Sequence, residues 1–310
     1  MKKVFIDGSA GTTGLRIHER LSNRNDIELI ILPDEYRKDN EHIKKAINEA
    51  DVAFLCLPDA AAIEAVSFIE NENTVVIDTS TAHRTNENWA YGFPELSKSF
   101  EEKIKTSKRI AVPGCHASGF IALVYPLIEA GILSDDVLLS CHSITGYSGG
   151  GKKMIAEYES ADKSQLLLAP RQYALTQQHK HLKEMSKITG IKNMPLFSPI
   201  VSNFYSGMEV TVPLHVSQLK KGTTFEDIKN VYNAKYTGPI VKFCENTDTD
   251  GFLSAATLSN KDSMKVSVYG NEDRIILTAV YDNLGKGASG AAIECLNIVV
   301  GAHKHYGLEI

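Results

Sequence analysis

Cys115 occupies the position in this chain that most favours covalent chemistry. It follows a proline–glycine pair, and it precedes an apolar run over residues 120–128 that predicts a buried helix. A thiol at the point where a loop enters a helix lies among unpaired backbone N–H groups, at the positive end of the helix dipole. Both features lower the pKa of a thiol and favour the nucleophilic thiolate. The alternative is that Cys115 is a small buried apolar residue, as most free cysteines are.

Two histidines are candidates for an acid/base partner of this thiol. His179 and His181 lie two positions apart, and in an extended segment that spacing puts both imidazoles on one face. A metal would need a third ligand at suitable spacing, and none follows nearby, so we expect no metal site. We therefore favour one of the pair as the acid/base, slightly preferring His179, with a solvent-exposed pair as the alternative.

A glycine turn near the N-terminus connects a strand-like run to a helical pattern. Residues 3–6 are apolar, and the turn has glycines at positions 8, 11 and 14. Such glycines let the backbone approach a pyrophosphate, which the first N–H groups of the following helix then bind. An ordinary tight turn is the alternative. The residues that we expect to contact a dinucleotide here are Gly8, Ser9, Gly11, Thr12, Thr13 and Gly14.

Alternating strands and helices position this turn. Short apolar runs at residues 27–32, 52–57 and 74–78 are separated by helical patterns at 41–50 and 59–69, the second with Asp59 as its cap. Near-continuous apolar strands separated by helices predict an α/β fold with a doubly wound parallel sheet.

Two basic residues after the second strand bear on the choice of cofactor. That strand ends without the acidic residue that would hold a ribose 2′-hydroxyl, and Arg37 and Lys38 follow. A basic pair suits a 2′-phosphate, so NADP is favoured over NAD, although a solvated surface pair is the alternative.

Polar residues also follow the fourth strand, at the edge of the sheet where ligands bind. Ser80 has a hydroxyl for the cofactor, and the planar cation of Arg84 suits a phosphate or carboxylate of the substrate. Capping residues with a surface arginine are the alternative.

The second half of the chain has a different pattern. A strand at 137–144 enters a glycine-rich segment in which Ser148, Gly149 and Lys152 could hold an anionic substrate, although any flexible loop has this composition. Alternating strands at 209–215, 265–269 and 274–281 predict a mixed or antiparallel sheet, with a hairpin between the last two. The last helix, 291–302, begins after a second glycine-rich turn, in which Gly287 would face the cofactor. We expect residues 1–114 and 286–310 to form the NADP-binding domain, and residues 115–285 the catalytic and oligomerisation domain.

Composition excludes several other classes of protein. The 310 residues carry a net charge of −5, which favours neither nucleic acid nor an anionic membrane as a partner. No apolar run approaches the roughly 18 residues that span a bilayer. The chain begins with a strand-like run instead of a signal peptide, and its five cysteines are scattered without metal-site spacing. We expect a cytoplasmic protein with mostly unpaired thiols.

With these motifs in place, the chain resembles the N-acetyl-γ-glutamyl-phosphate reductases, most closely their shorter, type 2 form. The resemblance runs nearly end to end. It depends on G-S-A-G-T-T-G (8–14), D-T-S-T-A-H-R (78–84), Y-G-F-P-E-L (91–96), P-G-C (113–115), T-G-Y-S-G-G-G-K (145–152), H-K-H (179–181) and D-N-L-G-K-G-A-S-G-A-A (282–292). The sequence departs from the family pattern at His116, where an aromatic residue is usual, at Lys183 and at Glu294.

This resemblance implies a fold, a reaction and an assembly. The fold is a doubly wound NADP-binding domain with an α+β catalytic domain like those of glyceraldehyde-3-phosphate and aspartate-semialdehyde dehydrogenases. The reaction is the NADPH-dependent reduction of N-acetyl-γ-glutamyl phosphate to N-acetylglutamate 5-semialdehyde in arginine biosynthesis, through a thioacyl intermediate on Cys115. The assembly is a homo-oligomer, either a dimer or a tetramer.

Two other functions are weighed against this one. An aspartate-semialdehyde dehydrogenase would share the fold and the cysteine chemistry, but the H-K-H block and the serine- and glycine-rich segment argue against it. An NADP-sensing binding protein without catalysis would lack a nucleophile or a base, and both are present.

Overall fold

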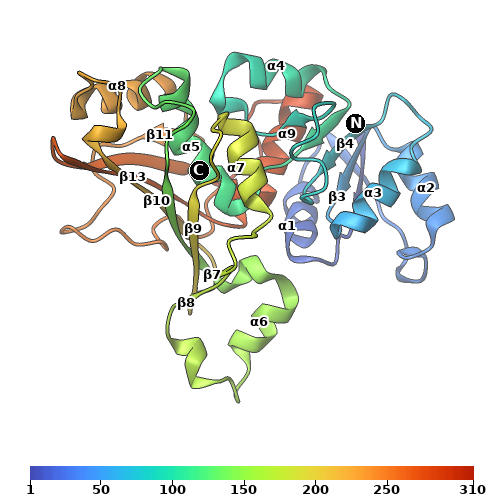
Figure 1. The fold of residues 1–310 in the computed structure, drawn as a ribbon. Helices are drawn as coiled ribbons and strands as arrows, with labels where there is room; N and C mark the ends of the chain where they lie inside the picture. Colours follow the sequence, from blue (N-terminus) through green and yellow to red (C-terminus); the bar gives the residue numbers. More distant parts are fainter. The chain divides into compact units, whose positions relative to one another are not determined.

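The computed structural model describes residues 1–310, which form two compact units (Figure 1). The first unit comprises residues 1–114 and 288–308, and the second comprises residues 115–287 with the last two residues of the chain. No helix is both long enough and apolar enough to cross a bilayer.

The first unit is built on a parallel six-stranded sheet in the order β2-β1-β3-β4-β6-β5. Its strands are β1 (Lys2–Asp7), β2 (Ile27–Ile30), β3 (Val52–Leu55), β4 (Val75–Asp78), β5 (Ala90–Tyr91) and β6 (Arg109–Ala111). Every residue of β3 and β4 is buried, as strands covered on both faces require. The doubly wound parallel sheet expected from the sequence is confirmed.

Helices cover both faces of this sheet because neighbouring side chains of a strand point in opposite directions. The helices are α1 (Thr12–Leu21), α2 (Asn40–Glu49), α3 (Asp59–Ser67), α4 (Lys98–Thr106) and α9 (Gly290–Val300). Val4 and Ile6 of β1 belong to the core formed with α1, α4 and α9, whereas Phe5 belongs to the core formed with α2 and α3. The carboxyl ends of the strands are thereby fixed along one edge.

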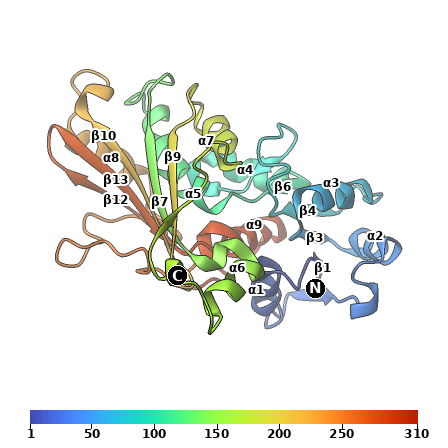
Figure 2. The same cartoon turned by 60° about the horizontal axis from the view of Figure 1, so that its bottom comes forward.

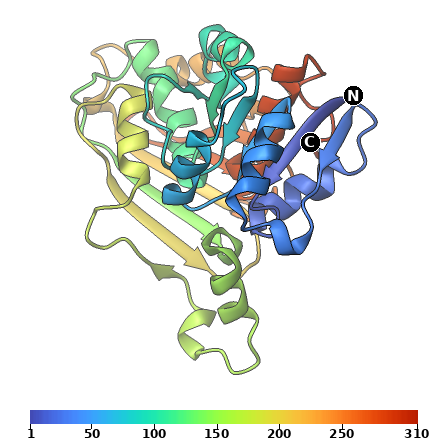
Figure 3. The same ribbon diagram turned by 90° about the vertical axis from the view of Figure 1, so that its right-hand side faces the viewer.

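The second unit is built on a mixed seven-stranded sheet in the order β11-β12-β13-β10-β7-β9-β8. Its strands are β7 (Ser140–Gly146), β8 (Arg171–Gln172), β9 (Leu196–Ser202), β10 (Met208–His215), β11 (Val241–Phe243), β12 (Met264–Gly270) and β13 (Arg274–Tyr281). Figure 3 shows β7 in green beside β9 in yellow, a parallel pair. The expected hairpin is also confirmed: β12 pairs antiparallel with β13, and the side-chain oxygen of Asn271 accepts two backbone N–H groups in the turn.

Four α-helices accompany this sheet: α5 (Cys115–Glu129), α6 (Gly151–Glu159), α7 (His181–Thr189) and α8 (Phe225–Lys235). Helix α5 packs on β10 and β13, and α8 packs on β12 (Figure 2). Close packing of α5 depends on Gly119, where a Cβ atom would lie 2.6 Å from the Cγ2 atom of Val210. On the opposite face of the sheet, Leu196 and Ile276 remain 68% and 42% exposed.

A proline within α5 requires compensation from α8. Pro126 has no N–H group, so the carbonyl of Ala122 loses its usual helical donor. The hydroxyl of Tyr236 donates to this carbonyl at 2.7 Å, and the hydroxyl of Tyr232 donates to the carbonyl of Leu123. These buried tyrosines thus stabilise α5 in its second half.

Replacing Tyr236 by phenylalanine should lower the free energy of unfolding by about 1–3 kcal/mol, because the Ala122 carbonyl would be left buried without a donor. In a Pro126→Ala background the restored N–H group can bond this carbonyl, so the same substitution should cost less. Urea unfolding of the four proteins measures both costs, and equal costs in the two backgrounds would contradict this account.

Candidate active site

Cys115 is the first residue of α5 and is partly exposed. The hydroxyl of Tyr281 holds the first turn of the helix: it accepts the N–H of Gly119 at 3.0 Å and donates to the carbonyl of Cys115 at 2.5 Å. Gly287 lies alongside, and a Cβ atom there would be 3.1 Å from the Cβ atom of Cys115. A thiol at a helix start, as the sequence indicated, is therefore held from two sides.

His179 and His181 are neighbours in space, although not for the expected reason. The segment is not extended: Lys180 has helical backbone angles, and α7 begins at His181. The two rings lie 4.6 Å apart and nearly perpendicular, and the backbone N–H of His181 donates to Nδ1 of His179 at 3.2 Å. Since Nδ1 accepts, the neutral ring of His179 carries its proton on Nε2. Burial, and then the charge of Lys180, lower the pKa of His179, which favours this neutral form.

A third imidazole, His116, was noted in the sequence only as a departure from the family pattern. Its buried ring lies 6.0 Å from the ring of His179 and 5.6 Å from that of His181. Its Nδ1 is 2.6 Å from the Ser143 hydroxyl, and its Nε2 is 2.6 Å from the Tyr173 hydroxyl. Burial lowers the pKa of His116 to about 3, so the ring is neutral near pH 7. The sequence could have indicated His116 as a site residue because it directly follows Cys115. Its hydrogen-bond partners, Ser143 and Tyr173, come from distant segments.

Tyr173 is a second residue that sequence reasoning missed. Burial raises the pKa of its hydroxyl, and the negative charge of Cys115 raises that pKa further. The hydroxyl lies 2.6 Å from Nε2 of His116, the residue that follows Cys115. The second unit therefore gathers a thiol, three imidazoles and a phenol around the start of α5.

The glycine-rich segment after β7 forms a short helix, residues Tyr147–Gly150, which continues into α6. Ser148 is buried, and its hydroxyl accepts a hydrogen bond from the side-chain amide of Asn283 at 3.0 Å. Gly149 and Lys152 are exposed. The Ser148 hydroxyl thus keeps its own proton as a donor, as an anionic ligand would need.

In the first unit, the glycine turn packs closely against neighbouring backbone. Gly8 has a φ of +79°, and a Cβ atom there would lie 2.3 Å from the carbonyl oxygen of Cys56. A Cβ atom on Gly14 would lie 2.4 Å from the carbonyl oxygen of Gly8. Helix α1 starts at Thr12 without a side-chain cap, so its first N–H groups can bind an anion. Beside the turn, burial raises the pKa of Asp7 to about 6.

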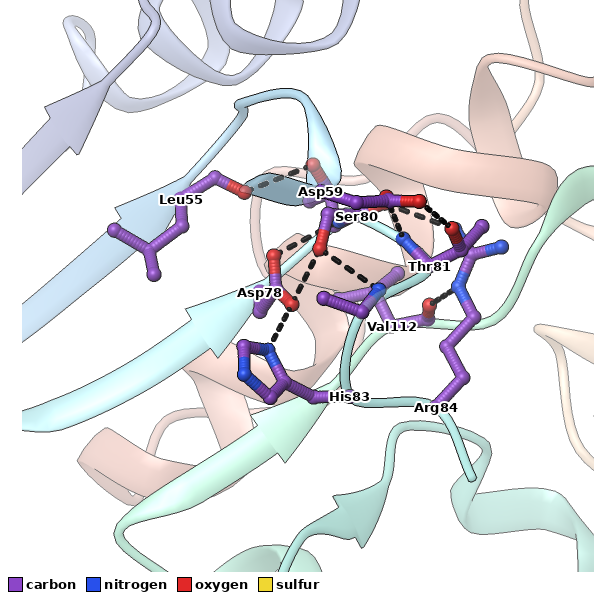
Figure 4. A network of polar contacts seen from close by, with 10 residues as sticks. Leu55, Asp59, Asp78, Ser80, Thr81, His83, Arg84 and Val112 are labelled. Atoms are coloured by element: carbon purple, nitrogen blue, oxygen red, sulfur yellow. Dashed lines mark hydrogen bonds and ion pairs between the residues drawn. The ribbon is translucent and has the colours of Figure 1, made fainter. Parts of the chain in front are cut away.

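A polar network follows β4, where the sequence indicated Ser80 and Arg84 (Figure 4). The Ser80 hydroxyl donates to the Asp78 carboxylate at 2.7 Å and accepts the N–H of Ala82 at 3.1 Å. Arg84 is 8% exposed, and its guanidinium donates at 2.8 Å to the carbonyls of Val112 and of Thr79. Both side chains therefore hold this loop in place.

Asp59 does not cap α3 as expected. The N-cap residue is Pro58, and the Asp59 carboxylate instead accepts the N–H and the hydroxyl of Thr81 (Figure 4). The Asp59 carboxylate still lies in the first turn of α3, near the positive end of the helix dipole. An acidic residue is therefore favourable at this position even though it does not cap the helix. Farther along the sheet edge, Arg37 and Lys38 are exposed, and Arg37 pairs with Asp34 at 2.9 Å.

Comparison with known proteins agrees with this architecture. Residues 115–283 match the family described as semialdehyde dehydrogenase, dimerisation domain, and residues 33–106 match semialdehyde dehydrogenase, NAD binding domain. Aspartate semialdehyde dehydrogenase II of Vibrio cholerae, complexed with ASA, superposes with a TM-score of 0.75 at 17% identity, over 97% of this chain and 98% of that one. The enzyme of Candida albicans with NADP superposes with a TM-score of 0.67 at 15% identity, over 99% of both chains. Fold and site thus define an oxidoreductase of the semialdehyde dehydrogenase class, with a nicotinamide dinucleotide-binding domain.

Relatives with higher sequence identity narrow the class. The N-acetyl-γ-glutamyl-phosphate reductase of Rhizobium etli (strain CFN 42) is 43% identical over 305 residues, which cover 96% of this chain and 98% of that protein. The protein of the same name from Burkholderia lata is also 43% identical, over 96% of both. The chain belongs to the N-acetyl-γ-glutamyl-phosphate reductase family, which confirms the resemblance seen in the sequence.

Replacing Gly8 by alanine should destabilise the first unit and weaken dinucleotide binding, because the new Cβ would meet the Cys56 carbonyl at 2.3 Å. Gly301→Ala is the matched control, since Gly301 has a similar φ of +73° in the same unit but no atom within 4 Å of the added Cβ. The control should lose about 1–2 kcal/mol to backbone strain alone. Gly8→Ala should lose about 1–3 kcal/mol more through overpacking. Denaturant unfolding measures the loss of stability, and NADPH fluorescence measures the loss of binding. Equal losses of stability in Gly8→Ala and Gly301→Ala would contradict the close contact between Gly8 and the Cys56 carbonyl.

Proposed function

We propose that this protein catalyses the NADPH-dependent reduction of N-acetyl-γ-glutamyl phosphate to N-acetylglutamate 5-semialdehyde and phosphate, a step of arginine biosynthesis. The observation that carries the proposal is the cluster around the start of α5, in which Cys115 has neutral imidazoles and a phenol as neighbours. Family membership favours this substrate over aspartate semialdehyde, because the relatives at 43% identity carry the reductase name.

Cys115 acts as the nucleophile. Its thiolate attacks the carbonyl carbon of the acyl phosphate, the C–S bond forms, and the C–O bond to phosphate breaks. The first N–H groups of α5 stabilise the thiolate, because a helix start leaves these donors without partners within the helix. The product of this step is a thioester on Cys115 and inorganic phosphate.

His179 handles the proton in the second half of the reaction, with His181 as the alternative. The reduced dinucleotide, when bound, supplies a hydride to the thioester carbonyl. The Nε2–H of His179 donates to the oxyanion, while the backbone of His181 holds the other side of the ring. Such proton transfer contributes about 10²–10⁴-fold to the rate. As the hemithioacetal collapses, its hydroxyl proton returns to His179, the C–S bond breaks, the semialdehyde leaves and the Cys115 thiolate is restored.

The remaining candidate residues bind the ligands. Arg84, Ser148, Gly149 and Lys152 serve the substrate, with Ser148 donating its proton to an anionic oxygen and Arg84 also holding the loops after β4 and β6. The proposed contacts of NADP are Gly8, Ser9, Gly11, Thr12, Thr13, Gly14, Arg37, Lys38, Ser80 and Gly287. Since the Ser80 hydroxyl already donates to Asp78, it would meet the cofactor as an acceptor.

We further infer that the protein works as a homo-oligomer, a dimer or a tetramer, in the cytoplasm. The match to a dimerisation domain and the exposed Leu196 and Ile276 on the uncovered sheet face support a second copy on that face. A catalytic thiol, in a chain where no disulfide joins the five cysteines, suits a reducing compartment.

An assay in the direction of NADPH formation, with N-acetylglutamate 5-semialdehyde, phosphate and NADP⁺, tests the function. Cys115→Ser should lose at least about a thousandfold in turnover, because a serine hydroxyl is a far weaker nucleophile without a thiolate, yet it should still bind NADPH. Cys244→Ser, away from the cluster, is the control and should keep its activity. Normal turnover of Cys115→Ser, or preference for aspartate semialdehyde, would reject the proposal.

Preference for NADP should depend on Arg37 and Lys38. Replacing both by alanine should raise KM for NADPH about tenfold and leave KM for NADH nearly unchanged, because only NADPH has the 2′-phosphate. Lys45→Ala, another exposed lysine of this unit, is the control. Equal changes in KM for NADPH and for NADH would mean that Arg37 and Lys38 do not contact the 2′-phosphate.

A further inference from the structure

Gln177 lies where the backbone leaves an edge of the second sheet without a strand partner. Strand β8 pairs antiparallel with β9, and the N–H of Tyr173 continues this pairing by donating to the carbonyl of Pro199 at 3.0 Å. The chain then turns away, with the N–H of Gln177 donating to the carbonyl of Ala174 at 3.0 Å. Along β9, the next residue that presents its N–H and carbonyl on this edge is Phe197, two positions before Pro199.

The side-chain amide of Gln177 takes the place of the missing strand residue. Its nitrogen donates to the carbonyl of Phe197 at 2.8 Å, and its oxygen accepts the N–H of the same residue at 2.9 Å. A primary amide offers the same donor and acceptor as a strand backbone. One side chain therefore satisfies both backbone groups of Phe197 on this edge.

The turn that presents this amide has a strained backbone. Ala174 and Gln177 have φ angles of +53° and +57°, in the left-handed region where a residue with a Cβ atom costs free energy. Such a conformation persists only where other contacts hold it. The paired hydrogen bonds of Gln177 tie the turn to β9 and so oppose its relaxation.

The ring of Phe197 extends this constraint to the imidazoles. It lies 5.3 Å from the ring of His179 and 5.4 Å from that of His116, edge to face in both cases. His179 follows Gln177 by two residues, and its carbonyl accepts the N–H of Leu182 in the first turn of α7. The amide thus fixes both sides of one contact: the backbone of Phe197 and the segment that leads into His179.

We propose that Gln177 is a positioning residue for His179, whose ring it keeps against Phe197 by pairing its side-chain amide with the backbone of β9. Gln177 is exposed, so it acts through the backbone and not on the reacting atoms. The acid/base role of His179 rests on the proposed function, whereas its fixed position does not.

The test is the pH titration of His179 in the full-length chain, followed by NMR of ¹⁵N-labelled imidazoles, with a His179→Gln variant to assign the signal. The titratable groups that face this ring come from three segments: His116 of α5, Tyr173 after β8, and Lys180 and His181 at the start of α7. Burial lowers the pKa of His179, so a ring that leaves Phe197 and meets water should titrate at higher pH.

Two substitutions of Gln177 separate the amide from the backbone conformation. Gln177→Met keeps the length of the side chain but not the amide, and should raise the midpoint of His179 by about half a pH unit or more. Gln177→Gly relieves the strain at the positive φ but also lacks the amide, and should raise the midpoint as well. Gln178→Met, at the exposed glutamine next in the chain, is the matched control and should leave it unchanged.

Three results would overturn the positioning role. They are an unchanged midpoint in Gln177→Met, a normal midpoint in Gln177→Gly, which would assign the position of His179 to the turn alone, and an equal shift in Gln178→Met. Thermal unfolding of each variant shows whether the fold is kept.

Titration needs no acyl phosphate, so its result is separate from the proposed reaction. An inactive wild type would reject the substrate assignment and leave the NMR result to be judged by itself. In an active enzyme, Gln177→Met should lower kcat about tenfold with little change in KM for NADPH, because a displaced proton donor slows the reaction and not cofactor binding. A raised midpoint with normal kcat would keep the positioning role and reject His179 as the acid/base.

Discussion

The first turn of α5 is held in place by the phenol of Tyr281, and the proposed chemistry depends on this contact. Its hydroxyl bonds both the N–H of Gly119 and the carbonyl of Cys115, so β13, an interior strand of the sheet, fixes the start of the helix. Gly119 lets the helix approach β10, and Gly287 lets the segment after β13 approach Cys115. Glycines therefore allow close packing on both sides of the first turn of α5. The position of Cys115 is thus fixed by packing around the start of the helix.

Burial also sets the charge around the thiol. The rings of His116 and His179 are desolvated, so both are neutral near pH 7 and act as directional hydrogen-bonding groups instead of cations. Neutral imidazoles do not form an ion pair with a thiolate, and the helix start is left as its main stabilising feature. In neutral His179 the proton is on Nε2, because Nδ1 accepts the backbone N–H of His181. The buried phenols of Tyr173 and Tyr281, whose pKa values are raised, remain protonated as donors.

In the first unit too, hydrogen bonds hold polar side chains in fixed positions. After β4, the hydroxyls of Ser80 and Thr81 donate hydrogen bonds to the carboxylates of Asp78 and Asp59 (Figure 4). The ring of His83 also stacks on that of Trp89 at 4.0 Å. These contacts hold the loop after β4 in place. The sequence had predicted Ser80 as a cofactor contact and Asp59 as a helix cap, but not these pairings. A loop that is ordered before the cofactor arrives loses less conformational entropy on binding.

Local patterns in the sequence determined the parallel sheet, the glycine turn, the β12–β13 hairpin and the cysteine at a helix start. They did so because strand periodicity, glycine geometry and helix termini are properties of neighbouring residues. The turn at His179 and the pairing of Asp59 with Thr81 were not foreseen, since each depends on a backbone path or a partner that short-range spacing does not encode. Only the tertiary structure could place Ser143 and Tyr173 on the two sides of His116. Those three residues lie on segments far apart in the chain, and what joins them is the burial of polar groups that must find partners once water is excluded.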